Sequence, residues 1–123
     1  MRPTDTTLPL EGFRLASRGG NLFVVGLDTG ENEKMPEGGA SRGTRNGVYT
    51  FLEDYLDVRW LLPGPMGEDV ALRASVLLPA MDRTERPSFR NRRVPGMQNM
   101  QAAVAEWSAR RHGTRAWNAT VSR

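Results

Sequence analysis

The chain contains no cysteine and no isoleucine, and Lys34 is its single lysine among 123 residues. Without cysteine there can be no disulfide framework, thiolate zinc site, iron–sulfur cluster or thiol nucleophile. Lysine and isoleucine both depend on codons rich in A and T, so their scarcity indicates a GC-rich genome. The other sixteen basic side chains are arginines, and this choice of arginine over lysine therefore says little about a ligand.

The sequence also lacks a long apolar run. No stretch approaches the roughly 18 apolar residues that a membrane-spanning helix needs. Residues 1–10 do not show the basic start and apolar segment of a secretory signal. We therefore expect a protein that is made in the cytoplasm and does not contact a membrane.

Length and composition predict one small domain with much irregular structure. A domain of 123 residues buries about 65% of the surface that its unfolded chain exposes. Thirteen glycines and eight prolines are more than average usage provides, which indicates many turns, loops and extended segments.

Two parts of the sequence have clear patterns. Glu11–Ser17 and Leu22–Asp28 are joined by Arg-Gly-Gly-Asn, and they predict a β-hairpin because Gly-Gly tolerates the positive φ angles of a tight turn. Apolar residues in Val48–Leu56 recur at helical spacing and share one face. We expect this helix to begin near Asn46 and to be stopped by the Pro-Gly-Pro at residues 63–65.

Two later segments have weaker patterns. Apolar residues alternate from Val70 to Leu78, which favours a half-buried strand. The acidic pair at 68–69 would also suit the first turn of a helix, so strand and helix both remain open for residues 68–80. A second amphipathic helix is expected from Met97 to about His112.

Together these elements predict an α+β fold: a small domain with a β-hairpin, one or two further strands and two amphipathic helices, plus long extended N- and C-terminal arms. The expected parts are an N-terminal arm at 1–10, a single domain at 11–113 and a C-terminal arm at 114–123. Within the domain we expect a Gly-rich loop at 29–47 and an Arg-rich connector at 82–96. Loops of this length in compact domains are typically functional or are held by a neighbour.

The segment Leu22–Asp28 runs into Asp28-Thr29-Gly30, which resembles the catalytic turn of retroviral-type aspartic proteases. Such an enzyme uses two aspartates that share a proton, so a chain of this length would have to act as a dimer. The family also has a small residue where this chain has Glu31 and a second apolar-Gly-Arg segment that is absent here. The same stretch resembles the first strand of RNase H-like nucleases, which need further carboxylates on other strands. We expect Asp28 to end a strand and cap a turn.

Two further motifs lack the residues that their chemistry needs. Gly38–Thr44 has the spacing of a phosphate-binding loop but no lysine before Thr44 to reach the terminal phosphates. His112 is the only histidine, and Arg110 and Arg111 precede it; they would oppose its protonation and repel a metal ion. We therefore expect neither an enzyme nor a cofactor or metal site.

Positive charge is concentrated near the C-terminal end. Residues 1–81 carry eight basic and eleven acidic side chains, a net charge of −3, whereas residues 82–123 carry nine and three, a net charge of +6. Codon usage selects arginine over lysine but does not move charge to one end. The predicted partner-binding residues are the arginines and aromatic residues of this basic part: Arg83, Arg86, Phe89, Arg90, Arg92, Arg93 and Trp117.

These residues suit two kinds of partner. Guanidinium groups bind carboxylates and phosphates, and an aromatic side chain among them can stack on a base. The arginines would therefore pair either with nucleic acid or with acidic residues of a neighbouring subunit, such as Glu53, Asp54 and Asp57 on the predicted helix of another copy. A net charge of only +3 favours the protein partner.

The function expected from these observations is that of a non-enzymatic subunit of a large particle, a homo-oligomer ordered by contacts with other subunits. Small structural proteins of tailed-phage particles share this general style. The specific expectation is a capsid-associated or head-to-tail connector protein, located in the virion and otherwise in the cytoplasm. The first alternative is a nucleic-acid-binding or ribosome-associated protein that uses residues 83–93. The second is a dimeric hydrolase that uses Asp28.

Overall fold

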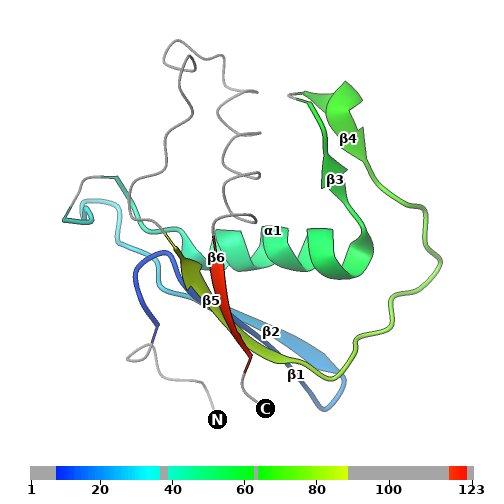
Figure 1. The fold of residues 1–123 in the computed structure, drawn as a ribbon, viewed down its shortest axis with the longest axis horizontal. Helices are drawn as coiled ribbons and strands as arrows, with labels where there is room; N and C mark the ends of the chain where they lie inside the picture. Colours follow the sequence, from blue (N-terminus) through cyan, green and yellow to red (C-terminus); the bar gives the residue numbers. More distant parts are fainter. Residues whose placement is uncertain (1–7, 37–38, 63, 89–116, 122–123) are drawn as a thin grey trace.

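The structure is a computed structural model that describes residues 8–36, 39–62, 64–88 and the backbone of 117–121. It is a small α+β domain in which α1 packs on one face of an antiparallel sheet with the strand order β2-β1-β5-β6 (Figure 1). A second sheet contains only β3 and β4. In chain order the elements are β1 (Phe13–Arg18), β2 (Asn21–Gly26), α1 (Gly43–Leu56), β3 (Arg59–Trp60), the 3-10 turn η2 (Pro65–Gly67), β4 (Glu68–Asp69), β5 (Asp82–Pro87) and β6 (Trp117–Val121).

The predicted β-hairpin is confirmed. Strands β1 and β2 pair in register from Phe13 opposite Gly26 to Arg18 opposite Asn21. The two residues between the strands, Gly19 and Gly20, have φ angles of 57° and 77°. A two-residue turn with positive φ at both positions matches the twist of the flanking strands, which explains the Gly-Gly sequence.

The core lies between β1, β2 and α1. Phe13 and Leu15 alternate on the face of β1 toward the helix, and both are completely buried. Gly47 brings the helix close to this face, since a Cβ at this position would lie 2.8 Å from Val24 Cγ1 and 3.1 Å from the Phe13 ring. The absence of a side chain at Gly47 therefore sets the distance between helix and sheet.

Helix α1 begins at Gly43, earlier than the start near Asn46 that the apolar pattern predicts. The cause is a close approach between two backbones. A Cβ at Gly43 would lie only 2.2 Å from the Gly12 carbonyl oxygen, and the Gly43 N–H donates to the Leu27 carbonyl at 3.3 Å. Glycine, which lowers helix propensity, is therefore required here for packing. The Gly-rich loop accordingly ends before the helix, at residue 42.

The helix ends well before the Pro-Gly-Pro at residues 63–65. Asp57 follows its last turn with a φ angle of 56°, and the Val58 N–H donates to the Leu52 carbonyl at 3.1 Å. The Asp57 N–H also donates to the Leu52 carbonyl, and the left-handed conformation of Asp57 turns the chain out of the helix. Trp60, which is buried, then packs edge-on against Tyr49 of α1 with ring centroids 5.4 Å apart.

The prediction of a strand at Val70–Leu78 is wrong. These residues form neither strand nor helix, and their large apolar side chains are mostly exposed. The strand lies further along the chain, because Asp82–Pro87 of the expected Arg-rich connector forms β5 beside β1. Ser17 directs this pairing: its N–H donates to the Met81 carbonyl at 2.9 Å, and its hydroxyl accepts from the Met81 N–H at 2.9 Å.

Other expected parts fall largely outside the described residues. The second helix at Met97–His112 does so completely, as do residues 1–7 of the expected N-terminal arm. Within the expected C-terminal arm, Trp117–Val121 forms β6 and pairs antiparallel with β5. In the part of the chain that is described, no helix has the length and apolar character needed to cross a membrane.

Candidate interaction surfaces

Arg83 lies on the face of β5 that points toward α1. The register places Arg83 opposite Leu15 and Glu85 opposite Phe13, so both charged side chains share the face of the buried core residues. The Arg83 guanidinium donates to Asp54 Oδ2 on α1 at 2.6 Å and also forms an ion pair with Glu85. Arg83 therefore links β5 to α1 within the chain.

Burial and neighbouring charges have opposite effects on the pKa values of Arg83 and Glu85. Burial alone would lower the pKa of Arg83, but its bonds to Asp54 and Tyr55 and the charge of Glu85 raise its pKa overall. Glu85 is only 3% exposed. Its burial raises its pKa, and Arg83 offsets only part of that effect. Such a pair adds little net stability, but losing one partner leaves a buried charge and is costly.

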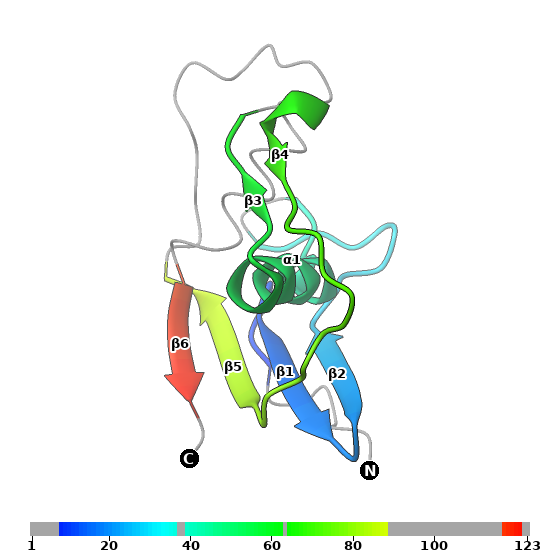
Figure 2. The same cartoon turned by 90° about the vertical axis from the view of Figure 1, so that its right-hand side faces the viewer.

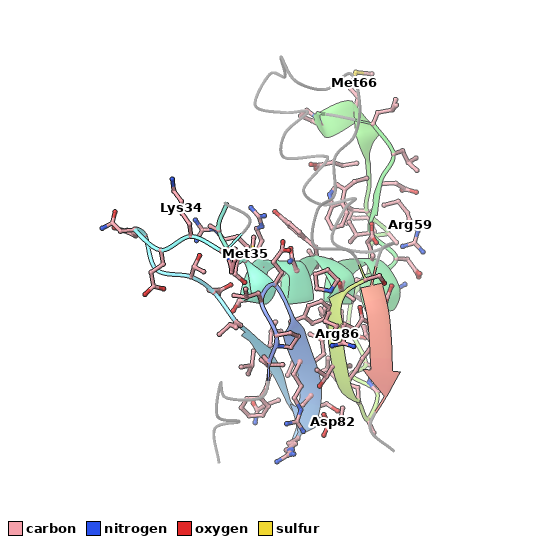
Figure 3. The ribbon with its side chains drawn as sticks, turned by 60° about the vertical axis from the view of Figure 1, so that its left-hand side comes forward. Lys34, Met35, Arg59, Met66, Asp82 and Arg86 are labelled. Atoms are coloured by element: carbon pink, nitrogen blue, oxygen red, sulfur yellow. The ribbon has the colours of Figure 1, made fainter. Side chains whose placement is uncertain are left out.

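Arg86 lies on the opposite face of β5 and is exposed. Figure 3 shows it near one end of the strand and Asp82 near the other. Asp82 is already occupied, because Arg14 of β1 donates to its two carboxylate oxygens at 2.7 and 2.6 Å. This two-pronged hydrogen bond from Arg14 lowers the pKa of Asp82. Two of the arginines that we predicted to bind a partner are described, Arg83 and Arg86. Of these two, Arg86 is the exposed one.

Most of the other residues that we predicted to bind a partner lie outside the described part of the chain. Phe89, Arg90, Arg92 and Arg93 lie outside the described residues. Trp117 falls in β6, where its backbone is paired with Pro87.

The acidic side of α1 is used within the chain. Besides the contact of Asp54 with Arg83, Asp57 accepts from Arg73 Nη2 at 2.5 Å and lies 3.8 Å from Arg59 Nη2. We expected these aspartates to pair with arginines of another copy. In the structure Asp54 and Asp57 form ion pairs with Arg83, Arg73 and Arg59, all of which follow α1 in the same chain.

Asp28 acts as a cap for α1. Its Oδ1 accepts from the Thr44 N–H at 3.1 Å, in the first turn of the helix, and its backbone forms an isolated bridge with Arg42. A carboxylate at this end of a helix satisfies a free N–H and interacts favourably with the helix dipole. Within the described ranges, no three His, Cys, Asp or Glu side chains come together as they would around a metal ion.

A second, apolar surface was missed by the sequence reasoning. Strands β3 and β4 with the η2 turn form a hairpin that projects from α1 on the side away from the sheet (Figure 2), and the chain then runs past the end of α1 to β5. Seven large apolar side chains along this path are exposed, and Met66 and Leu72 are as exposed as in an extended peptide, at 101% and 102%. We call them the apolar projection: Leu61, Leu62, Met66, Val70, Leu72, Val76 and Leu77.

The signal for this surface was present in the sequence. Leu61 and Leu62 precede Pro-Gly-Pro, where no helix continues, and apolar residues are frequent in 70–78. The hairpin itself is well defined, because the Leu61 N–H donates to the Gly67 carbonyl at 2.7 Å. Leu61, Leu62 and Met66 are therefore held on a folded element, whereas the other four exposed side chains lie on the segment that follows it.

Comparison with known proteins returns no similarity. No protein-family model matches this chain, and neither a curated protein nor a solved structure matches it.

Proposed function

We propose that the protein is a non-enzymatic assembly subunit that binds other protein subunits through the apolar projection. The observation that supports this most is the concentration of seven exposed large apolar side chains on one hairpin and the segment after it. Soluble monomers rarely leave large connected apolar patches in water, and such patches are typical of protein interfaces.

The size of the core supports the same proposal. The fully buried apolar side chains of the described residues are few, with Phe13 and Leu15 at the centre. A small domain buries a low fraction of its surface, and oligomerisation is a common source of the missing stability. Homo-oligomerisation through the apolar projection would supply further burial.

The particle that we propose is a tailed-phage virion, in which the chain would serve as a capsid-associated or head-to-tail connector protein. This placement rests on a general likeness in style to small virion proteins. It predicts a defined ring or a shell-bound subunit as the functional state.

The first test is the molar mass of the purified full-length chain, measured by light scattering after size-exclusion chromatography over a wide range of concentrations. The proposal predicts a mass above 13.7 kDa that rises to a plateau with concentration. A mass of one chain at all concentrations would contradict self-assembly.

Nucleic-acid binding is the second candidate function, and the exposure of Arg86 favours it. Arg90, Arg92 and Arg93 follow this residue closely in the sequence. A phosphate-binding role predicts an affinity for RNA or DNA that falls steeply with salt and is lost when these three arginines are neutralised. Binding that shows neither effect would argue against a phosphate-binding role, and the assembly function would remain the proposal.

A further inference from the structure

We propose that the segment Val70–Leu78 of one copy adds as a strand to the free edge of β2 in a second copy. The inference rests on the proposed assembly function and names the two surfaces that meet. Because one surface is the segment and the other is the edge of a strand, the contact joins two different patches. Such contacts repeat head to tail and close into a ring or continue as a filament.

The segment has the sequence of a strand but pairs with no strand among the described residues. Val70, Leu72, Ala74, Val76 and Leu78 alternate with other residues, as in a half-buried strand. No backbone hydrogen bond joins these residues to another strand within the described part of the chain.

Both ends of the segment are fixed. Near its start, Arg73 is bound to Asp57 at the end of α1. Just beyond its other end, the Ser17 hydroxyl donates to the Pro79 carbonyl at 2.8 Å. A segment that is already held in place loses less conformational entropy when it binds. Its backbone and apolar side chains are thus presented to solvent in advance.

Strand β2 is a suitable acceptor because it is the terminal strand of the described sheet. Its six residues, Asn21–Gly26, include no charged residue and no proline. Natural edge strands usually carry lysine, proline or a bulge that prevents pairing with another chain. The absence of these features leaves the β2 edge open to a further strand.

The side chains of β2 also lack cover. Phe13 and Leu15 on the neighbouring strand are completely buried, whereas no apolar side chain of β2 is. Phe23, on the face away from α1, is 44% exposed. An added strand would cover residues on both faces of β2, because its side chains alternate between the two faces.

The geometry requires a second copy. In its own chain the segment passes the end of α1 and enters β5 near the β1–β2 turn, instead of running along the β2 edge (Figures 1 and 2). The charges are also compatible, since Arg73 is neutralised by Asp57 and β2 carries no charge. Backbone addition of this kind takes its affinity from main-chain hydrogen bonds and its specificity from alternate side chains.

Cross-linking tests the contact directly, because the chain has no cysteine of its own. Phe23→Cys and Val76→Cys chains would be mixed and treated with a short bismaleimide. The proposal predicts a cross-linked dimer as the main product of the mixture, and little product from either variant alone. A chain carrying both substitutions should give a ladder of multimers.

The control is Val48→Cys, an exposed position on α1, mixed with Val76→Cys; it should give no more dimer than the single variants. If the chain forms oligomers by mass but Phe23→Cys and Val76→Cys do not cross-link, the strand addition is wrong and the assembly function stands. Efficient cross-linking of Val76→Cys to Thr120→Cys on β6 instead would also overturn the proposal, because the acceptor would be the other edge. A chain that stays monomeric would overturn both the strand addition and the assembly function.

Discussion

Arg83 on β5 donates a hydrogen bond to Asp54 on α1 at 2.6 Å while also pairing with the buried Glu85. One guanidinium thus links the strand to the helix that covers it. This use of Arg83 limits how much of the basic C-terminal charge is available to a partner.

Replacing Arg83 with methionine should destabilise the domain. The substitution keeps most of the apolar stem but leaves Glu85 buried without its cation, so we expect the free energy of unfolding to fall by about 3 kcal/mol. Arg86→Met on the exposed face of the same strand is the matched control and should change it by less than about 0.5 kcal/mol. Urea denaturation followed by Trp fluorescence would measure both, and equal effects would refute the structural role of Arg83.

The same cluster predicts a dependence of stability on pH. The pKa of Glu85 is raised in the folded state above its ordinary value of 4.5, so the folded chain holds this proton more tightly than the unfolded chain does. The contribution of Glu85 is therefore most favourable below pH 4.5 and declines as pH rises through its folded pKa. Glu85→Gln should remove this decline in urea titrations at several pH values. An unchanged pH profile in the Gln variant would show that Glu85 does not titrate as its burial implies.

Two glycines should respond differently to substitution by alanine. At Gly47 the added Cβ would meet the Val24 and Phe13 side chains, which can shift, so we expect a loss of about 1–3 kcal/mol, partly offset by better helix propensity. At Gly43 it would meet the carbonyl oxygen of Gly12, which is backbone. Gly43→Ala should therefore have the lower melting temperature in calorimetry. The reverse order would argue against the close crossing of Gly12 and α1.

Asp28 should behave as a helix cap. Asp28→Asn keeps an oxygen acceptor for the Thr44 N–H, so the free energy of unfolding should fall by about 0.5 kcal/mol, whereas Asp28→Ala should lose about 1 kcal/mol. Thermal melts of both variants would measure this order. A peptidase or nuclease activity that disappears in Asp28→Asn while the fold persists would instead support the dimeric hydrolase.

Local patterns in the sequence predict much of this fold. The hairpin follows from Gly19 and Gly20 together with the alternation of Phe13 and Leu15, all within one short segment. The apolar spacing at Val48–Leu56 correctly predicts that α1 exists, but it does not predict which side is buried. The buried residues of α1 are Gly43, Asn46, Gly47, Thr50 and Glu53, and Val48 is exposed. The start of α1 depends on the contact of Gly43 with Gly12, which no local pattern contains.

Non-local contacts explain the errors. Alternation at Val70–Leu78 predicts a strand, but a strand also needs a neighbour to pair with, and these residues pair with no strand in the described part of the chain. The strand partner of β1 is instead the Arg-rich Asp82–Pro87, which Ser17 holds in register. The ion pair of Arg83 with Asp54 depends on this register, so charge density alone does not predict it.

Self-assembly through the apolar projection can be tested by sedimentation equilibrium of a charged variant. Leu72 and Leu77 are almost fully exposed, so Leu72→Glu with Leu77→Glu should leave the melting temperature of the domain nearly unchanged. We predict that this double variant sediments as a single chain at concentrations where the parent chain and a Val48→Glu control are oligomeric. An unchanged oligomer mass in the folded double variant would show that the apolar projection does not mediate self-assembly.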